Sequence, residues 1–351
     1  MIDRLPEDAQ TLHSEMLASL IALESERGWS HLSGSFTTKV VKGSEYVYFQ
    51  YSDPGGAKRQ FSLGRRSAAL DEIIAGYGTQ REHHASDTAV IERLAGLLRS
   101  AGLAMIPHGP SRVIRALADA GVFRLGGVLI GSYAFQILGN LLGVRWPAAA
   151  WRTQDVDIAG HLQVAMPQLQ ADVPKALDSL RMGFVPVPQL DSRLPSSSFR
   201  VRGKQLSVDL ITPGGERDVN PIFIPRFNAA AAPIKFLSLV MNDAQPAAAV
   251  DNSAILVVVP APARFALHKL LVSQTRSLIQ QTKSGKDLHQ AALLLEVLAE
   301  DRPGDLEMAV DAFKKSGPAV IRKVVRGLDA AVKRWPDEGS GVSFVRSLLA
   351  E

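Results

Sequence analysis

Two aspartates that alternate with aliphatic residues, Asp155-Val156-Asp157-Ile158, constrain the fold of this chain more than any other feature of its sequence. Residues two apart in a β-strand project from the same face, so this pattern places both carboxylates on one face and the aliphatic side chains on the other. Paired aspartates on one face of a buried strand are costly unless a cation lies between them. Asp209 is a third acid in an equally apolar segment, LSVDLI. If the two segments are neighbouring strands, the three carboxylates converge, and the sequence predicts a site for Mg²⁺ or Mn²⁺.

A glycine–serine step lies upstream of this pair of acids. Gly131 and Ser132 follow the apolar run VLI and precede a segment with helical character, residues 133–143. Such a step exposes backbone N–H groups and one hydroxyl at a helix N-terminus, which suits a phosphate group. Gly-Ser turns are also common as plain connections. The hypothesis therefore depends on the order of the elements: strand, Gly-Ser, helix, loop, Asp-x-Asp strand and a later strand with an acid.

The composition excludes several kinds of chemistry. The chain has no cysteine, which removes disulfides, thiolate catalysis and cysteine-ligated metals. No apolar run reaches the roughly 18 to 20 residues that span a bilayer. The N-terminal segment lacks the apolar stretch of a secretory signal, so we expect a cytoplasmic protein without a membrane partner. A net charge of +4 is a mild excess, compatible with a polyanionic partner and equally with an ordinary solvated surface.

Changes in hydrophobic period divide the chain into three parts. Residues 7–27 have helical spacing, residues 34–64 hold short β-branched and aromatic runs around two glycine-containing turns, and residues 66–104 return to helical spacing. Two prolines and a glycine near residue 107 indicate a boundary. We predict an α+β protein built from an N-terminal helix and three-stranded meander module (1–105), a core of mixed sheet and helices (106–225), and a mostly helical C-terminal part (226–351) with one strand, 254–259, that extends the core sheet.

The order of these elements resembles the signature of the polymerase-β-type nucleotidyltransferase superfamily, an hG[GS] step followed by a DhDh strand and a third acid. The matching residues are Gly131, Ser132, Asp155, Asp157 and Asp209. The segments FRLGGVLIGSYAF, WRTQDVDIAG, VVVPAPARFALHKLL and KSGKDLHQAALLLEVL are similar to a bacterial family of nucleotidyltransferase-fold proteins of uncharacterised role, and YVYFQYSDPGGAKRQFSLG is similar to that family's leading meander. More distantly, the chain is similar to the AbiEii- and MenT-type nucleotidyltransferase toxins.

This resemblance implies a polymerase-β-like core that transfers a nucleoside monophosphate from an NTP, such as ATP, to an acceptor hydroxyl on RNA, a protein or a small molecule. Asp155 and Asp157 would hold Mg²⁺, while Asp209 would bind a second metal ion and help to deprotonate the acceptor. Gly131 and Ser132 would hold the β- and γ-phosphates. A role as a toxin or defence component is one biological option that the resemblance suggests.

Further nucleotide contacts are expected on both sides of the acids. Arg152 and Thr153 come just before them and are candidates to touch phosphate or to orient the first acid, although a loop arginine is often simply solvated. In the related toxins a lysine of the helical element after the core contacts the triphosphate; by position, the candidates here are Lys269 and Lys286. The adjacent His268 is interpreted as a satisfied structural histidine. The gap from the glycine–serine step to the acids is longer than is usual in the superfamily.

Alternatives to these interpretations come from other classes of protein. The acids could be an exposed strand end, and the same fold could serve as a non-catalytic module that binds a nucleotide or nucleic acid. In the meander, four basic residues are interleaved with four aromatic ones; they are Lys39, Lys42, Lys58 and Arg59 with Tyr46, Tyr48, Phe49 and Tyr51. This pattern suits nucleic-acid binding, but we favour aromatics that fill a thin core, since strand alternation produces the same pattern. The oligomeric state is left open.

Overall fold

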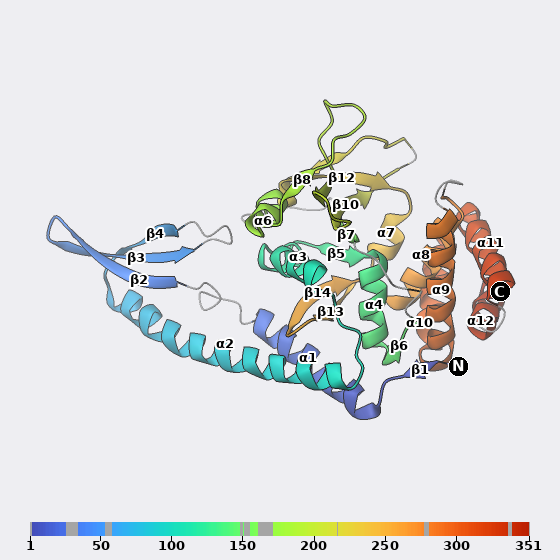
Figure 1. The fold of residues 1–351 in the computed structure, drawn as a ribbon, viewed down its shortest axis with the longest axis horizontal. Helices are drawn as coiled ribbons and strands as arrows, with labels where there is room; N and C mark the ends of the chain where they lie inside the picture. The colour runs from blue at the N-terminus through green and yellow to red at the C-terminus, as the bar shows by residue number, and fades with distance from the viewer. Residues whose placement is uncertain are drawn as a thin grey trace.

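Helices and strands are mixed along the chain, in agreement with the α+β prediction. In Figure 1 a central sheet lies among helices, a group of helices covers one side, and a long helix with a small sheet projects from the other. No helix in the part of the chain that the structure describes is long and apolar enough to cross a bilayer. The computed structural model describes residues 2–25, 34–52, 58–147, 150, 155–160, 171–215, 217–276, 281–335 and 339–350.

The described strands of the core form a seven-stranded mixed sheet in the order β11-β12-β10-β7-β5, with β9 on β10 and β8 on β9. Strands β7, β10 and β12 run parallel, whereas β5 is antiparallel to β7, so the end of β5 lies beside the beginning of β7. The bounds are β5 (Gly127–Ile130), β7 (Asp155–Gly160), β8 (Phe184–Pro186), β9 (Ser198–Val201), β10 (Ser207–Pro213), β11 (Ile222–Ile224) and β12 (Ala229–Ile234).

Short helices pack on this sheet and share its apolar core. Helix α4 follows β5 without an intervening loop, and α7 packs against both β10 and the first helix of the C-terminal part. The elements are α3 (His108–Asp119), α4 (Gly131–Leu141), α6 (Val173–Ser179), the 3₁₀ helix η2 (Pro225–Phe227) and α7 (Leu237–Met241).

The strand predicted over residues 254–259 is present as β14 (Ala254–Val259), but it does not extend the core sheet as predicted. It pairs instead with β13 (Gln245–Val250) in a separate two-stranded sheet, and β12 is the strand from this region that joins the core. Strands β12 and β13 are both rich in alanine, which has little preference for strands. Their alanines are mostly buried, so packing against neighbouring elements decides their structure.

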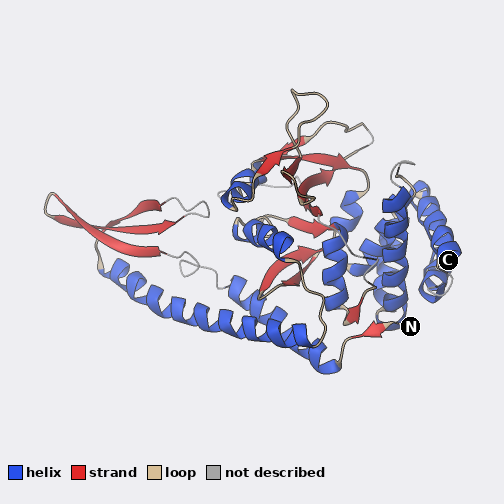
Figure 2. Ribbon diagram, in the orientation of Figure 1, coloured by secondary structure: helices blue, strands red, loops and turns tan. Residues whose placement is uncertain are grey.

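The C-terminal helices stand against one side of the sheet (Figure 2). Helices α8 and α9 pack side by side, and the three that follow each contact this pair. Proline at the start of α8, α10 and α11 suits the first helical turn, where its missing N–H leaves no bond unmade. The helices are α8 (Pro262–Ser273), α9 (Gln281–Asp301), α10 (Pro303–Lys314), α11 (Pro318–Arg334) and α12 (Gly339–Ala350).

At the other end, a long helix carries a three-stranded antiparallel sheet away from the core (Figure 1). We call this unit the arm; it consists of β2 (Gly34–Val41), β3 (Ser44–Ser52), β4 (Lys58–Arg65) and α2 (Ala68–Ser100). The base of the arm packs on α1 (Glu7–Ser25) and on the β13–β14 hairpin, in an apolar cluster that includes Met16, Leu98 and Ala248. The N-terminal helices therefore share a core with a hairpin from the C-terminal region, and the division at residue 105 stays a prediction.

A tryptophan side chain packs against helix α4 and confines it. Trp146 stacks on Phe135 with ring centroids 4.7 Å apart, and its indole N–H donates to the Phe135 carbonyl at 2.8 Å. The indole lies against Gly139, where a Cβ would overlap its atoms. Two short strands beside it, β1 (Asp3–Arg4) and β6 (Val144–Arg145), pair antiparallel. Because α4 begins at Gly131, this packing also sets the position of the glycine–serine step.

We expect Gly139→Ala to lower the free energy of unfolding by about 1–3 kcal/mol, because the methyl group overpacks against the indole. The matched control is Gly96→Ala in α2, where no atom lies within 4 Å of an added Cβ. There the gain in helix propensity should raise the free energy of unfolding by about 0.5–1 kcal/mol. Urea unfolding measures both variants, and an equal stabilisation in both would show that Trp146 does not confine α4.

Candidate functional site

Neighbouring strands place the backbone positions of two predicted acids beside the glycine–serine step. Strand β7 lies between β5 and β10. Asp157 on β7 is in register with Asp209 on β10 and with Ile130, the last residue of β5. Gly131 follows directly and begins α4. The backbone therefore places positions 157 and 209 side by side, next to the start of this helix.

Other predicted site residues are placed only in part. Asp155 stands two residues earlier on β7, in register with Ser207 of β10. The side chains of Asp155 and Asp157 lie outside what the structure describes, and so do Arg152 and Thr153 altogether. The described side chains form no group of three or more His, Asp or Glu residues that could hold a metal ion. The metal site at the three acids therefore stays a prediction.

The carboxylate of Asp209 is oriented by a serine that sequence reasoning missed. Ser198 on β9 is in register with Asp209, and its hydroxyl donates a hydrogen bond to Asp209 Oδ1. Asp209 is half-buried and lines a pocket. One carboxylate oxygen is thus held by β9, while the other has no hydrogen bond to a described residue. The signal that would have found Ser198 is the register of the β9–β10 hairpin.

The start of α4 has the properties of a phosphate site. Gly131 has a φ of +73°, a left-handed conformation that favours glycine and that lets the strand turn directly into the helix. The N-cap residue, Ile130, has no side chain that could accept from the first N–H groups of α4. Those donors carry the positive end of the helix dipole. Gly131 and Ser132 are half-buried and line the same pocket as Asp209.

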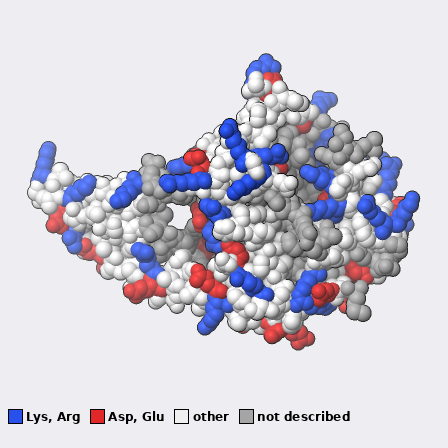
Figure 3. Space-filling model, in the orientation of Figure 1, with Lys and Arg blue, Asp and Glu red and all other residues white. Residues whose placement is uncertain are grey.

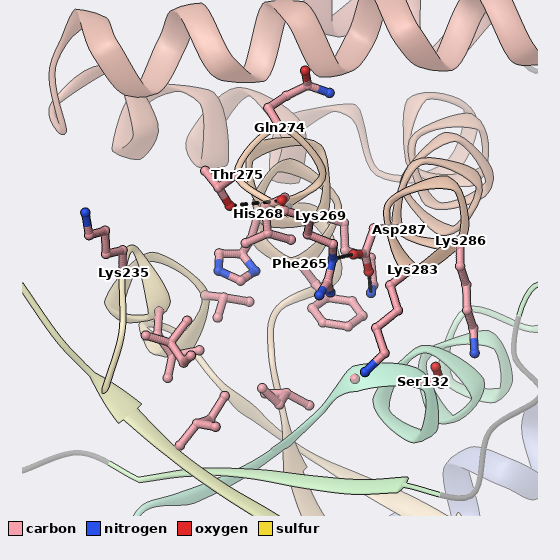
Figure 4. A pocket seen from close by; sticks show the side chains of 18 of the residues that line it. Ser132, Lys235, Phe265, His268, Lys269, Gln274, Thr275, Lys283, Lys286 and Asp287 are labelled. Atoms are coloured by element: carbon pink, nitrogen blue, oxygen red, sulfur yellow. Dashed lines mark hydrogen bonds and ion pairs between the residues drawn. The ribbon is translucent and has the colours of Figure 1, made fainter. Parts of the chain in front are cut away.

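This pocket, of about 740 Å³, lies between the end of the sheet and helices α7, α8 and α9. Figure 4 shows Lys283 and Lys286 extending from α9 toward Ser132 at the start of α4. Cationic residues outnumber acids in the described lining, so the pocket favours an anionic ligand. The cations are Lys235, Lys269, Arg276, Lys283, Lys286 and Lys323, and the acids are Asp209 and Asp287.

One wall of the pocket holds a group of three charges, two of them buried and the third, Arg276, half-buried. Lys269 on α8 and Asp287 on α9 are 5% and 6% exposed, and Lys269 Nζ lies 3.0 Å from Asp287 Oδ1. Arg276 Nε lies 2.7 Å from the other oxygen of the same carboxylate. Burial alone would raise the pKa of Asp287, but the two cations outweigh it and hold that pKa below its usual range. Asp287 therefore stays ionised and holds Lys269 at the pocket, where its ammonium also lies 4.6 Å from the centre of the Phe265 ring.

The histidine beside this lysine differs from its sequence interpretation. His268 is buried and lines the pocket, but its Nε2 has no hydrogen-bond partner among the described residues. Burial, reinforced by the charge of Lys269, lowers the pKa of His268 to about 3. The imidazole is therefore neutral near pH 7. In Figure 4 its ring lies on the Lys235 side of α8, away from Asp287, so it adds a neutral polar group to that half of the pocket.

Acidification should destabilise the protein through two buried histidines. Burial also lowers the pKa of His13 in α1 to about 4, so both histidines stay neutral in the folded chain at a pH where the unfolded chain binds protons. Stability is therefore full above about pH 6.5 and falls as the pH drops below it, by up to about 1.4 kcal/mol per pH unit for each histidine. Urea unfolding between pH 7.5 and 5.5 measures the slope. The double variant His13→Gln/His268→Gln should flatten it, and an unchanged slope would assign the effect to other groups.

Residues 108–314, more than half of the chain, match the sequence family described as nucleotidyltransferase. The chain belongs to this nucleotidyltransferase family. The match begins at α3 and ends with α10, so it contains the whole pocket wall from α4 to α9 and leaves out the arm. No curated protein matches the sequence. Among solved structures, the antigenic nucleotidyltransferase-like protein from Paracoccidioides brasiliensis is similar at 13% sequence identity and a TM-score of 0.37, over 68% of this chain and 95% of that chain.

The pocket thus brings together five of the predicted residues from segments far apart in the sequence. These are Gly131, Ser132, Asp209, Lys269 and Lys286. Sequence reasoning missed the cations of Lys235, Arg276 and Lys323, which lie before α7, just after α8 and on α11. No local pattern marks those residues, because only the packing of α7, α8 and α11 brings them near the sheet. The distant likeness to AbiEii- and MenT-type toxins stays a prediction.

Proposed function

We propose that the chain transfers a nucleoside monophosphate from an NTP to an acceptor hydroxyl, using a polymerase-β-like core and divalent cations held by Asp155, Asp157 and Asp209. The observation that carries the proposal is the register of Asp157 with Asp209 beside the start of α4, at a cationic pocket. Membership of the nucleotidyltransferase family supports nucleotide transfer in general.

The donor set suits the cation that this proposal requires. Mg²⁺ and Mn²⁺ prefer carboxylate oxygens, and the three proposed ligands are all aspartates. Asp209 has one oxygen anchored by Ser198, while the other makes no hydrogen bond to a described residue. Divalent cations bound there would neutralise charge on the reacting phosphate and favour loss of the acceptor hydroxyl proton.

The other residues of the pocket would bind and orient the triphosphate. The N–H groups at the start of α4 and the hydroxyl of Ser132 would receive the β- and γ-phosphates, with Lys283 and Lys286 opposite them (Figure 4). Lys269 donates a hydrogen bond to Asp287, which holds the ammonium in place. This ammonium would add a positive charge to the triphosphate site. The volume, about 740 Å³, falls in the range of pockets that hold a ligand of nucleotide size.

Two radioactive labels on the same nucleotide test the reaction. Each NTP is supplied with ³²P in either the α- or the γ-phosphate, together with Mg²⁺ and total RNA or cell lysate. Nucleotidyl transfer moves the α label to a macromolecule and leaves the γ label in pyrophosphate. Asp157→Asn should abolish α labelling, whereas Asp178→Asn, an exposed acid on α6, should not change it.

Other label patterns would contradict the proposal. Transfer of the γ label alone would mean phosphoryl transfer and would overturn it. Metal-dependent binding of NTP with neither release of pyrophosphate nor transfer of the α label to any acceptor would favour the alternative of a non-catalytic nucleotide-binding module.

A further inference from the structure

The small sheet of the arm has two chemically different faces, and the inner one is an aromatic core. Phe36 of β2 and Phe49 of β3 are in register and contact each other edge to face at 5.0 Å. Both rings also contact Tyr77 of α2, at 5.2 Å and 5.6 Å. Part of the aromatic pattern of the meander is therefore explained by a packed interior. These residues do not account for the tyrosines that alternate with them along β3.

The outer face of the sheet carries two of those tyrosines on its central strand. Tyr46 and Tyr48 stand at alternate positions to the buried Val47 and Phe49, and both are partly exposed. Lys39 Nζ lies 4.8 Å from the centre of the Tyr48 ring, which places the two side chains on one face. The described residues of the outer face include Thr37, Lys39, Tyr46, Tyr48, Gln50, Lys58, Gln60, Ser62 and Arg65.

Among the described residues of this face, positive charge is not balanced by acids. Tyr46 lies between Lys39 and Arg65 in the register of the three strands, and Lys58 is exposed near the start of β4. Glu45 belongs to the opposite face, because it is in register with Val40. In Figure 3 the Lys and Arg side chains of the arm gather mostly along its upper edge, over the strands, and the Asp and Glu side chains along its lower edge, over α2. The outer face therefore combines flat aromatic rings with cations and hydrogen-bonding amides and hydroxyls.

We propose that the outer face of the arm binds single-stranded nucleic acid. Unpaired bases would stack on Tyr46 and Tyr48, and phosphates would contact Lys39, Lys58 and Arg65. A single strand fits this chemistry better than a duplex, since a duplex hides the flat faces of its bases. An acidic protein partner would also contact the cations, but it has no bases that could stack on the two rings. This inference does not depend on the proposed transfer reaction, and the family match leaves the arm out.

Fluorescence anisotropy with the full chain tests the tyrosines. The probe is a labelled oligouridylate of about 20 nucleotides, longer than the roughly 4 to 16 nucleotides that one OB-fold, a larger single-strand-binding unit, occupies. Tyr46→Thr/Tyr48→Thr introduces threonine, which also favours strands, and should weaken binding at least about 10-fold, from the loss of two stacked bases. Tyr46→Phe/Tyr48→Phe keeps the rings and should bind like the unaltered protein, and equal urea unfolding of the two pairs would exclude misfolding as the cause of a difference in binding.

The salt dependence of the same binding tests the cations. Replacing Lys39, Lys58 and Arg65 by alanine should reduce the slope of log affinity against log salt by about 2, since each phosphate neutralised on a single strand contributes about 0.7. The matched control removes the same charge from the far end of the molecule, by alanine at the exposed Lys315, Arg322 and Arg326. That control should leave the slope unchanged.

A comparison of different oligonucleotide probes identifies the ligand of the outer face. Tight binding of oligouridylate, of oligothymidylate or of both supports the proposal and identifies RNA or DNA as the ligand. Equal affinity for duplex RNA, unchanged binding by the threonine pair, or self-association through this face without oligonucleotide binding would each overturn it. Asp157→Asn should bind the probe normally, so loss of the transfer reaction and loss of this surface give separate results.

Discussion

Asp209→Asn is expected to lower kcat for nucleotide transfer by at least about 100-fold, because even partners outside the immediate ligands of a metal ion commonly contribute 10- to 100-fold. The substitution keeps the shape of the side chain and an oxygen that can still accept from the Ser198 hydroxyl. It removes the charge that would hold a cation beside Asp157. Folding should therefore change little, and the loss should appear in the chemistry.

Metal titration separates this role from a structural one. With Asp209→Asn, the Mg²⁺ or Mn²⁺ concentration at half-maximal rate should rise, while urea unfolding without metal stays near that of the unaltered protein. Ser198→Ala frees the Asp209 carboxylate but keeps its charge, so it should cost less than Asp209→Asn. An Asp209→Asn variant that keeps both the full rate and the half-maximal Mg²⁺ concentration of the unaltered protein, while Asp157→Asn is inactive, would exclude Asp209 from the metal site.

Asp287→Ala should lower the free energy of unfolding by about 3–5 kcal/mol, the usual cost of leaving a buried charge without its partner. The substitution leaves the ammonium of Lys269, 5% exposed, without its carboxylate. Lys269→Met should cost less, because Asp287 keeps its ion pair with Arg276 at 2.7 Å. Urea unfolding should therefore show a larger loss of stability for Asp287→Ala than for Lys269→Met.

A double variant tests whether the cost comes from the unpaired charge or from lost packing. Lys269→Met/Asp287→Leu removes both charges and fills their space with apolar atoms, so it should be more stable than Asp287→Ala alone. Arg276, whose side chain is 28% exposed, can then turn to solvent. If the double variant is less stable than Asp287→Ala, packing rather than charge pairing holds α8 against α9.

The hydrophobic periodicity of the sequence was sufficient to predict the elements that bury one face and expose the other. The alternation of aromatic and polar residues between 34 and 64 corresponds to β2, β3 and β4, and the helical spacing after residue 66 corresponds to α2. It was insufficient for β12 and β13, whose alanines carry no strand preference and become strands only through burial. For the same reason the predicted extension of the core sheet by β14 was wrong.

The candidate site was predictable where its residues sit at the ends of regular elements. Gly131 begins the helix that follows β5 and Asp209 lies on β10, in an order of elements that could be inferred, and both line one pocket with Lys269. Arg276, just after α8, and Lys323, on α11, were not predictable, because a lone cation gives no sign of which pocket it will reach. His268 looked satisfied in an apolar helix, since the absence of a partner for Nε2 depends on neighbours that the local sequence does not specify.

The apolar cluster at the base of the arm determines when this part of the molecule can be completed during synthesis. Leu5, Met16 and Leu98 leave the ribosome early, but the cluster closes only when Ala248 and Ala254 have been made. Until then α1 and α2 present an open apolar surface, which is the kind of intermediate that aggregates or needs a chaperone. A fragment that ends near residue 105 would keep that surface permanently. The arm thus depends for its folding on a hairpin more than 140 residues downstream of its last helix.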